Sequence, residues 1–204
     1  IVGGTGLYFK ALTEGLVNIP KIPLKFREKV RTLHSKLGPK NFFLKLIKLD
    51  PLAKNYISYS DTQRSIRAYE VKLFTKKSMY DWFKNTKSDY EKKDFYKIYI
   101  NFPREELLKQ IRTRTRGMIK KGAIREVERF TKLRVPRSKS AYKAIGISEV
   151  KEYLNKKIKI EELIDKISIK TRQYAKRQST WGRGNMLDWI KLNPSRLNGF
   201  LKKI

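Results

Sequence analysis

Four short stretches of this sequence carry residue types that could bind an anion, and the first is GGT at residues 3–5. It follows two apolar residues and precedes a helical pattern, as expected where a buried strand ends. Two glycines let backbone N–H groups approach an anion closely, and the hydroxyl of Thr5 adds a donor. Gly-Gly turns are common, and the sequence contains no GxxxxGK[ST] phosphate loop. Alone, this turn is therefore a weak indication of function.

The second stretch is DTQRSIRAYE, which reads as the start of a helix. Arg64 and Arg67 are three residues apart, so they lie side by side on one helical face, and Gln63 is next to them. Such a trio can contact phosphate oxygens and a base edge. A solvated basic face is an equally good interpretation of these residues.

The third stretch, IRTRTRGM, places Arg112, Arg114 and Arg116 at every second position of a predicted helix. At that spacing the three side chains point in different directions. Arg114 lies four residues before the apolar Met118, so it could face the protein interior. A buried arginine needs an anionic partner, and a diphosphate would match its planar group of N–H donors.

The fourth stretch, TRQYAKRQSTWGRG, combines cations with aromatic rings on one predicted helix. Arg172 and Lys176 form a stripe at i,i+4 spacing, Arg177 lies on the adjacent stripe, and Tyr174 and Trp181 are interleaved. Basic stripes with aromatic side chains suit an RNA backbone with splayed bases. An idle basic surface is the alternative, but this is the strongest physical indication of function in the sequence.

The composition supports a polyanionic partner. The 204 residues contain 49 Lys and Arg against 19 Asp and Glu, a formal net charge of +30. Such an imbalance destabilises a compact state by self-repulsion unless a polyanion relieves it, although part of the lysine excess would fit a compositional drift. Apolar residues make up 40% of the chain, enough for a real core.

Several kinds of chemistry are absent from the sequence. It has no Cys, which excludes disulfides, Cys-ligated zinc and a thiol nucleophile. The single histidine, His34, reads as a surface residue of a basic helix without a role. We find neither paired carboxylates nor a Ser/His/Asp constellation that would supply a general base. No apolar run approaches the length needed to span a membrane, so we expect a soluble, cytoplasmic protein.

The elements that must position these residues are mostly helices. We expect a strand end, a turn and a helix at 1–17, followed by a loop at 18–23. Two helices should follow, one at 24–37 that Gly38 and Pro39 end, and one that stops at Asp50–Pro51. We then expect a helix at 62–77 with Ser60–Thr62 as its cap, a loop at 78–92 and a strand within 95–102. We further expect helices from Pro103 (at N1) to Gly122, at 123–133, at 148–154 with Ser148 as cap, and at 160–181, with a loop at 135–146. The sheet to which the strands belong has other members that we cannot locate.

Taken together, these stretches resemble one family. IVGGTGLYFKALTEGL, DTQRSIRAYEV, REELLKQIRTRTRGMIKKGAIREV, KAIGISEV and TRQYAKRQSTW occur in the order and spacing of tRNA dimethylallyltransferases, the IPP transferase family. The resemblance covers essentially the whole chain. It implies an α/β fold with a P-loop NTPase-like core (1–17 and 91–204) and a helical insertion domain that contacts tRNA (18–90).

Family members carry a further N-terminal segment with the phosphate loop and an Asp proposed as base, neither of which this sequence contains. We therefore expect this chain to be a mostly α-helical fragment that lacks core strands and is inactive by itself. The resemblance implies transfer of a dimethylallyl group from dimethylallyl diphosphate to N6 of adenosine 37 in tRNA, with release of diphosphate. It also implies a tRNA anticodon stem-loop as partner, Mg²⁺ held mainly outside this segment with no metal ligands here, and a monomer without membrane contact.

The family's functional residues carry over to individual positions. Thr5 and Arg114 match catalytic positions, Thr5 also being placed near tRNA and Arg114 being the implied diphosphate contact. The other implied tRNA contacts are Arg27, Gln63, Arg64, Ser65, Ile66, Arg67, Lys143, Ala144, Ile145, Gly146, Ile147, Ser148, Lys176, Arg177, Gln178, Ser179, Thr180, Trp181, Gly182 and Arg183. The sequence departs from the common pattern at Gln110, at the pair Ile147–Ser148 and at Gly182, which affects the details of RNA contact.

Three alternatives remain open. The main one is a non-catalytic, basic RNA-binding module. A basic structural protein, such as one associated with ribosomes, is the second, and it would tolerate Lys in place of Arg64, Arg67 and Arg177. A nucleoside or nucleotide kinase is suggested by the expected fold, but the stretch TRQYAKRQSTW argues against it.

Overall fold

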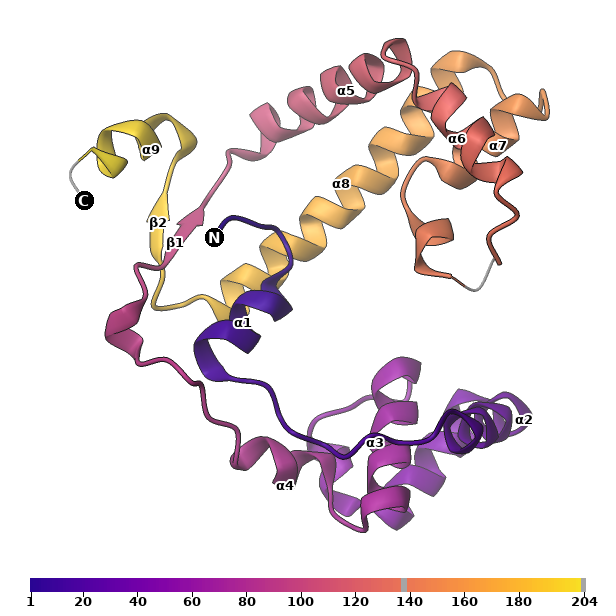
Figure 1. Ribbon diagram of the computed structural model, residues 1–204, viewed down its shortest axis with the longest axis vertical. Helices are drawn as coiled ribbons and strands as arrows, with labels where there is room; N and C mark the ends of the chain where they lie inside the picture. The colour runs from indigo at the N-terminus through magenta and orange to yellow at the C-terminus, as the bar shows by residue number, and fades with distance from the viewer. Residues whose placement is uncertain (137–138, 203–204) are drawn as a thin grey trace. The chain divides into compact units, whose positions relative to one another are not determined.

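The structure is a computed structural model and describes residues 1–136 and 139–202 (Figure 1). The chain divides into two compact units, one formed by Ile1–Gly6 together with Tyr96–Ile204 and the other by Leu7–Phe95. The second unit contains the whole stretch 18–90 that we expected to form the helical insertion.

Helices dominate both units. The α-helices are α1 (Gly6–Glu14), α2 (Leu24–Leu49), α3 (Thr62–Thr75), α4 (Met79–Lys84), α5 (Arg104–Lys120), α6 (Ala123–Lys132), α7 (Ile147–Leu154), α8 (Ile160–Asn185) and α9 (Pro194–Leu201). Short 3-10 helices occur at Pro51–Asn55, Lys92–Asp94 and Ser140–Lys143, and the strands are β1 (Ile98–Ile100) and β2 (Ile190–Leu192). The expected loop at 135–146 includes residues 137 and 138, which lie outside the described residues.

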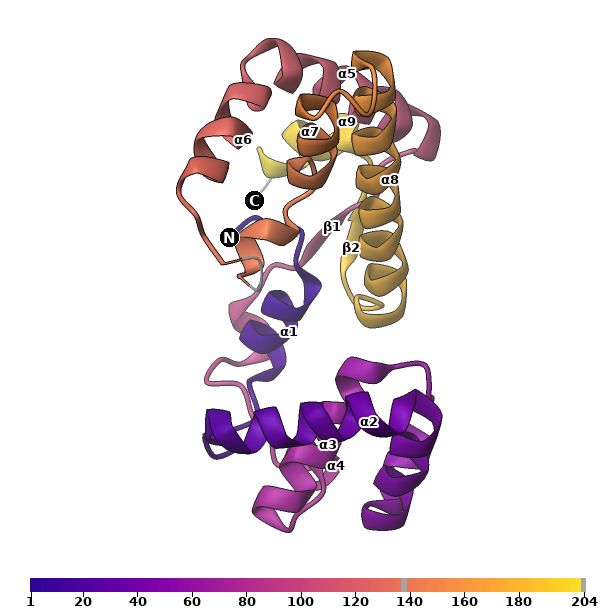
Figure 2. The ribbon, with the colours of Figure 1, turned by 90° about the vertical axis from the view of Figure 1, so that its right-hand side faces the viewer.

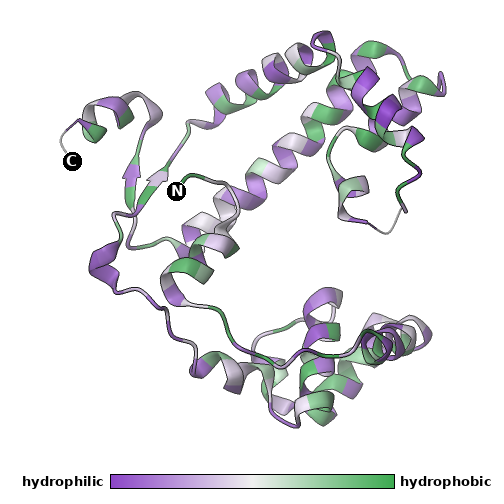
Figure 3. Ribbon diagram, viewed as in Figure 1, coloured by the Kyte–Doolittle hydropathy of each residue, from purple (hydrophilic) through white to green (hydrophobic). Residues whose placement is uncertain are grey.

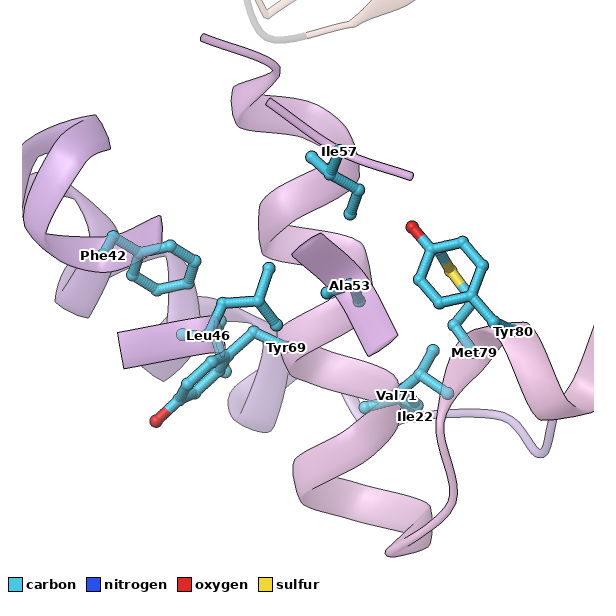
Figure 4. Close-up of a cluster of buried hydrophobic side chains, with 11 residues drawn as sticks. Ile22, Phe42, Leu46, Ala53, Ile57, Tyr69, Val71, Met79 and Tyr80 are labelled. Atoms are coloured by element: carbon cyan, nitrogen blue, oxygen red, sulfur yellow. The ribbon is translucent and has the colours of Figure 1, made fainter. Parts of the chain in front are cut away.

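The core of the unit Leu7–Phe95 forms where α2 packs on α3. Phe42 and Leu46 of α2 are fully buried against Tyr69 of α3, with the rings of Phe42 and Tyr69 5.0 Å apart (Figure 4). His34 packs its ring edge-on against Phe42 at 4.9 Å and is half-buried, so its assignment to the surface was wrong. The apolar spacing of both helices explains why they turn these faces inward.

Helix α2 is interrupted at the place that the sequence indicated. Gly38 has φ 72° and ψ 167°, a conformation that an L residue rarely adopts, and Pro39 restarts the helix after it. The predicted helix end at residue 37 is therefore a sharp kink between two helical segments.

The prediction of a long loop at 78–92 was wrong, because α4 and a 3-10 helix lie there. The Oγ of Ser78 accepts a hydrogen bond from the backbone N–H of Tyr80 (3.2 Å) and donates one to the buried carboxylate of Asp50 (2.7 Å). This capped start turns Met79 and Tyr80 into the core. Asp61 caps α3 as expected, with its Oδ1 3.1 Å from the backbone N of Arg64.

The two ends of this unit lie together. The Oγ of Ser88 donates a hydrogen bond to the backbone oxygen of Leu12 at 2.8 Å. Gly15, with φ 92°, lies so close to the backbone of Lys87 that a Cβ would overlap it. The chain thus enters and leaves the unit at one place.

The other unit combines a long helical pair with a small sheet (Figures 1 and 2). Helices α5 and α8 pack along each other, and α7 packs on α6 and α8. Strands β1 and β2 pair in parallel, with Ile98 opposite Ile190. The sequence predicted β1, but β2 and α9 were not anticipated.

A small apolar cluster closes the packing of α6, α7 and α8. Val127, Val150, Leu163 and Ile167 are buried together, and apolar and polar residues alternate along these helices (Figure 3). Helix α8 extends to Asn185, four residues beyond the predicted end. Pro103, which we predicted at N1 of α5, occupies its N-cap position, so the helix begins one residue later than predicted. Within residues 1–136 and 139–202, no helix is both long and apolar enough to cross a membrane.

Candidate nucleic-acid interface

The GGT turn is attached directly to the C-terminal half of α8. The side-chain amide of Gln178 donates a hydrogen bond from Nε2 to the backbone oxygen of Gly4 at 2.8 Å. Two residues later, a Cβ on Gly6 would overlap the indole of Trp181, so glycine is required for this approach. Thr5 lies between these two contacts with an exposed side chain. The structure therefore joins the first and fourth candidate stretches.

Helix α8 presents an exposed cationic surface next to this turn. Arg172, Lys176, Arg177 and Arg183 are all exposed, and the guanidinium of Arg177 lies over the ring of Tyr174 at 5.6 Å. Stacking on an aromatic ring restricts an arginine while leaving its donors available. Of the remaining implied contacts on α8, Ser179 is half-buried and Thr180 is exposed.

Gly182, the departure from the family pattern after Trp181, is buried rather than part of the exposed surface. A Cβ at Gly182 would lie 2.8 Å from the ring of Tyr99 in β1. The missing side chain thus makes room for a tyrosine of the sheet, and this glycine has a packing role.

The prediction that Arg114 faces inward was wrong. The buried positions of α5 are Ile111 and Thr115, whereas Arg114 is exposed and Met118 is 37% exposed. The prediction relied on the four-residue spacing between Arg114 and Met118. It failed because Met118 itself lies at the edge of the apolar face of α5.

The three arginines of α5 differ in their partners. Arg112 lies 3.0 Å from Asp165 and Arg116 lies 3.5 Å from Glu161, both on α8. Among the described residues, Arg114 has no carboxylate partner within ion-pair distance. It is thus the arginine of this group that no carboxylate of the described residues engages.

Arg114 and Trp181 are not brought together. The ion pairs of its neighbours place Arg114 beside the N-terminal part of α8, near Asp165. Trp181 lies sixteen residues further along, about 24 Å at the helical rise of 1.5 Å per residue. The structure therefore does not place Arg114 in one cavity with Thr5 and Trp181.

The candidate residues of α3 have different degrees of exposure. Gln63 and Arg64 are exposed, and Arg64 pairs with Asp61 at 3.4 Å. Ser65 is buried, with 2% of its surface exposed, and Ile66 packs against the core of its unit. In this structure Ser65 is therefore not accessible to RNA, and Ile66 is mainly a packing residue.

A buried carboxylate joins the remaining two candidate arginines of this unit. Oε2 of Glu70 lies 3.3 Å from Nε of Arg27 in α2 and 3.5 Å from Nη1 of Arg67 in α3. Glu70 was not among the residues singled out from the sequence. The spacing RxxE, one helical turn, was the signal that could have indicated it.

The stretch Lys143–Ser148 forms a turn held from beneath by a second buried acid. Oε2 of Glu149 accepts a hydrogen bond from the backbone N–H of Gly146 (2.9 Å), and Oε1 accepts one from Ser148 (2.9 Å) and pairs with Lys170. Burial alone would raise the pKa of Glu149, but these bonds outweigh it and hold the pKa below the usual value. The side chain of Glu149 thus caps the start of α7, and the prediction of Ser148 as its cap was wrong.

The exposure of that stretch is uneven. Lys143, Ala144 and Ser148 are exposed, Ile145 and Ile147 are half-buried, and Gly146 is buried with φ 110°. In the part of the chain that the structure describes, no three His, Asp or Glu side chains gather so as to hold a metal ion.

Comparison with known proteins assigns this arrangement to a class. The family model described as IPP transferase matches residues 1–185. A tRNA dimethylallyltransferase of Pelagibacter ubique is 53% identical over 100% of this chain and 65% of its own length. One of Rickettsia massiliae is 40% identical over 100% of this chain and 56% of its own length. The chain therefore spans less than two thirds of these relatives.

Solved structures agree in fold. A eukaryotic dimethylallyltransferase acting on tRNA superposes with a TM-score of 0.76 at 22% identity, over 99% of this chain and 54% of that one. A full-length tRNA isopentenylpyrophosphate transferase of Bacillus halodurans gives 0.53 at 26% identity, over 93% and 57%. By fold, the chain resembles enzymes that prenylate tRNA. It belongs to the IPP transferase family.

Proposed function

We propose that this chain is part of an enzyme that transfers a dimethylallyl group from dimethylallyl diphosphate to N6 of adenosine 37 in tRNA and releases diphosphate. The observation that carries the proposal is the attachment of the GGT turn to α8 through Gly4–Gln178 and Gly6–Trp181. It connects a backbone turn suited to an anion with a helix suited to RNA. Membership of the family and the names of its relatives support it.

The chain's own residues would first bind and orient the RNA. The exposed cations of α8 would contact the phosphates of an anticodon stem-loop, and Tyr174 and Trp181 would offer rings to unpaired bases. Adenosine 37 would leave its stack to reach the donor, which is the general requirement for chemistry on a base. Thr5, exposed between the two contacts of its turn, would lie next to the base.

The chemical step is an alkyl transfer. The N6 amine attacks the allylic carbon, the C–O bond to the diphosphate breaks, and the nitrogen releases its proton to solvent water or to a base outside this chain. The leaving diphosphate gains negative charge, so donors aimed at it would lower the barrier. Arg114 is our proposed diphosphate contact, because its guanidinium lacks the carboxylate partners of Arg112 and Arg116 in the part of the chain described. This contact rests on the family resemblance and on those unoccupied donors, because the position of Arg114 along α8, about 24 Å from Trp181, does not bring it to a base held beside Thr5.

Mg²⁺ is the cofactor that the family resemblance implies. The described residues include no cluster of acids or histidines that fits a metal ion. No step above is therefore assigned to a metal.

Labelled dimethylallyl diphosphate tests the proposal. The chain would be assayed by itself and as a chimera that supplies, from the Pelagibacter ubique relative, the part which this chain does not match. We expect the chimera to label a stem-loop with A37 and to leave one with G37 unlabelled. Tight binding of both stem-loops without any transfer would contradict the proposal and favour a non-catalytic RNA-binding module.

A further inference from the structure

Glu70 is a charged group buried in a protein that already has a large excess of positive charge. Its residue exposure is 1%, and Arg27 and Arg67 both approach the same oxygen, Oε2. Its other oxygen, Oε1, is buried without a hydrogen-bond partner among the described residues. Burial of a carboxylate under these conditions is costly even when cations surround it, so ion pairing alone is a poor reason for it.

The two arginines come from different helices and are only partly used by Glu70. Arg27 belongs to α2 and Arg67 to α3, and their side chains are 37% and 40% exposed. Each guanidinium carries five N–H donors, of which the contact with Glu70 occupies only part. Because one carboxylate oxygen lies within ion-pair distance of both groups, with a hydrogen bond from Arg67 alone, the two groups lie side by side with donors left for a further anion.

A phosphate diester matches this arrangement, since its two free oxygens can accept from two neighbouring guanidinium groups. Two unrestrained arginines would have to lose side-chain freedom on binding, whereas arginines already held in place lose less. A carboxylate beneath them therefore improves binding by orientation, although its charge by itself repels the phosphate.

We propose that Glu70 is a positioning residue that holds Arg27 and Arg67 as a paired phosphate-binding site for the RNA backbone. The identity of the ligand as RNA rests on the function proposed above. The role of Glu70 does not require transfer to occur, because binding alone reports it.

Glu70→Gln tests the inference through the sign of its effect. Removal of one negative charge from a chain of net charge +30 should tighten RNA binding if only overall electrostatics matter. If Glu70 orients the arginines, the same change should weaken stem-loop binding by about tenfold, the scale expected when one charged hydrogen bond is removed. The salt slope of log Kd should also decrease by about 0.7 to 0.9 for each phosphate that the variant no longer binds.

Glu28→Gln is the matched control. Glu28 is exposed, adjoins Arg27 in the sequence and has no ion pair among the described residues, so its amide variant removes the same charge without freeing an arginine. We expect this variant to bind the stem-loop as tightly as the parent chain, or more tightly. Thermal unfolding of both variants would show whether the unit remains folded.

Arg67→Lys provides a second test if Glu70→Gln unfolds the unit. It keeps the charge and removes the planar group, so we expect a similar decrease in affinity. Where Glu70→Gln is folded, the combined variant should show little further decrease. Parent-like binding by folded Glu70→Gln or by Arg67→Lys would overturn the inference, as would equal tightening in Glu70→Gln and Glu28→Gln. If the parent chimera transfers no prenyl group, the proposed function fails while this binding comparison still decides the role of Glu70.

Discussion

Gly6 lies directly against the indole of Trp181, with no room for a Cβ between them. This contact fixes the GGT turn to α8, together with the hydrogen bond from Gln178 to Gly4. It joins residues from opposite ends of the sequence, and it connects the two features on which the proposed function depends.

Gly6→Ala should therefore loosen the turn from α8. We expect the free energy of unfolding to fall by about 1–3 kcal/mol, the usual cost of overpacking, together with a change in Trp181 fluorescence. Gly117→Ala is the control, because nothing lies within 4 Å of a Cβ there and alanine favours the helix. Equal stability changes in the two variants, measured by urea unfolding, would contradict the close approach.

Gly182→Ala should disturb the sheet through Tyr99. The added Cβ would lie 2.8 Å from the Tyr99 ring, so we expect destabilisation of about 1–3 kcal/mol. Tyr99→Leu removes the ring, and the double variant should be less destabilised than the sum of the two single variants. If the changes in unfolding free energy of the two single variants add up in the double variant, residues 99 and 182 are not in contact.

Glu149 should make stability depend on pH in the acid range. Burial opposes its ionisation, but the bonds from Lys170, Ser148 and Gly146 together hold its pKa below 4.5 in the folded protein. A lowered folded-state pKa stabilises the protein above the unfolded-state value, and this stabilisation is lost as pH falls through the folded-state value. Thermal unfolding between pH 6 and about 3 should show this decrease in stability.

Glu149→Gln should remove that part of the acid dependence, whereas Glu126→Gln should retain it. Glu126 is an exposed acid of α6 without an ion pair among the described residues. An unchanged acid profile in Glu149→Gln would contradict the assigned hydrogen bonds.

Tyr80 should make stability depend on pH in the alkaline range. Burial first, and then the charge of Asp50, raise its pKa from 10.0 to about 12. Its contribution is complete below the unfolded-state pKa of about 10 and is lost as pH rises through the folded-state value. We expect the free energy of unfolding to decrease by roughly 1–3 kcal/mol over this range. Tyr80→Phe should flatten the profile, and a parent-like slope in that variant would refute the assignment.

Most of the longer helices and the cap of α3 were predictable because their signals are local. Asp61 before α3 and the apolar spacing of α8 each act within a few residues, and both appear in the structure. β2 was missed because three residues carry almost no periodicity and its partner β1 is about ninety positions away. Helix α4 was missed because the polar residues around its cap Ser78 are typical of a loop. The hydrogen bond from Ser78 to Asp50 that fixes this cap joins residues far apart in the sequence.

The candidate site was predictable in its cations and not in its acids. Arg172, Lys176 and Arg177 follow from a charged, aromatic pattern on one helix, whereas Gln178 was implied by the family resemblance alone. Glu70 and Glu149 resemble ordinary solvent-facing acids, because only tertiary packing shows that they are buried beneath the predicted contacts. Arg114 was assigned the wrong orientation because a single apolar neighbour does not define which face of a helix is buried.

Prenyl transfer to a stem-loop that differs in one amino group tests the central claim most directly. Two RNAs would be compared with the chimera, one with adenosine at position 37 and one with a purine nucleoside that lacks only the exocyclic amine. The account predicts addition of one dimethylallyl group to the first RNA, located at position 37, and none to the second. Transfer to both RNAs, or to neither while both are bound, would contradict it.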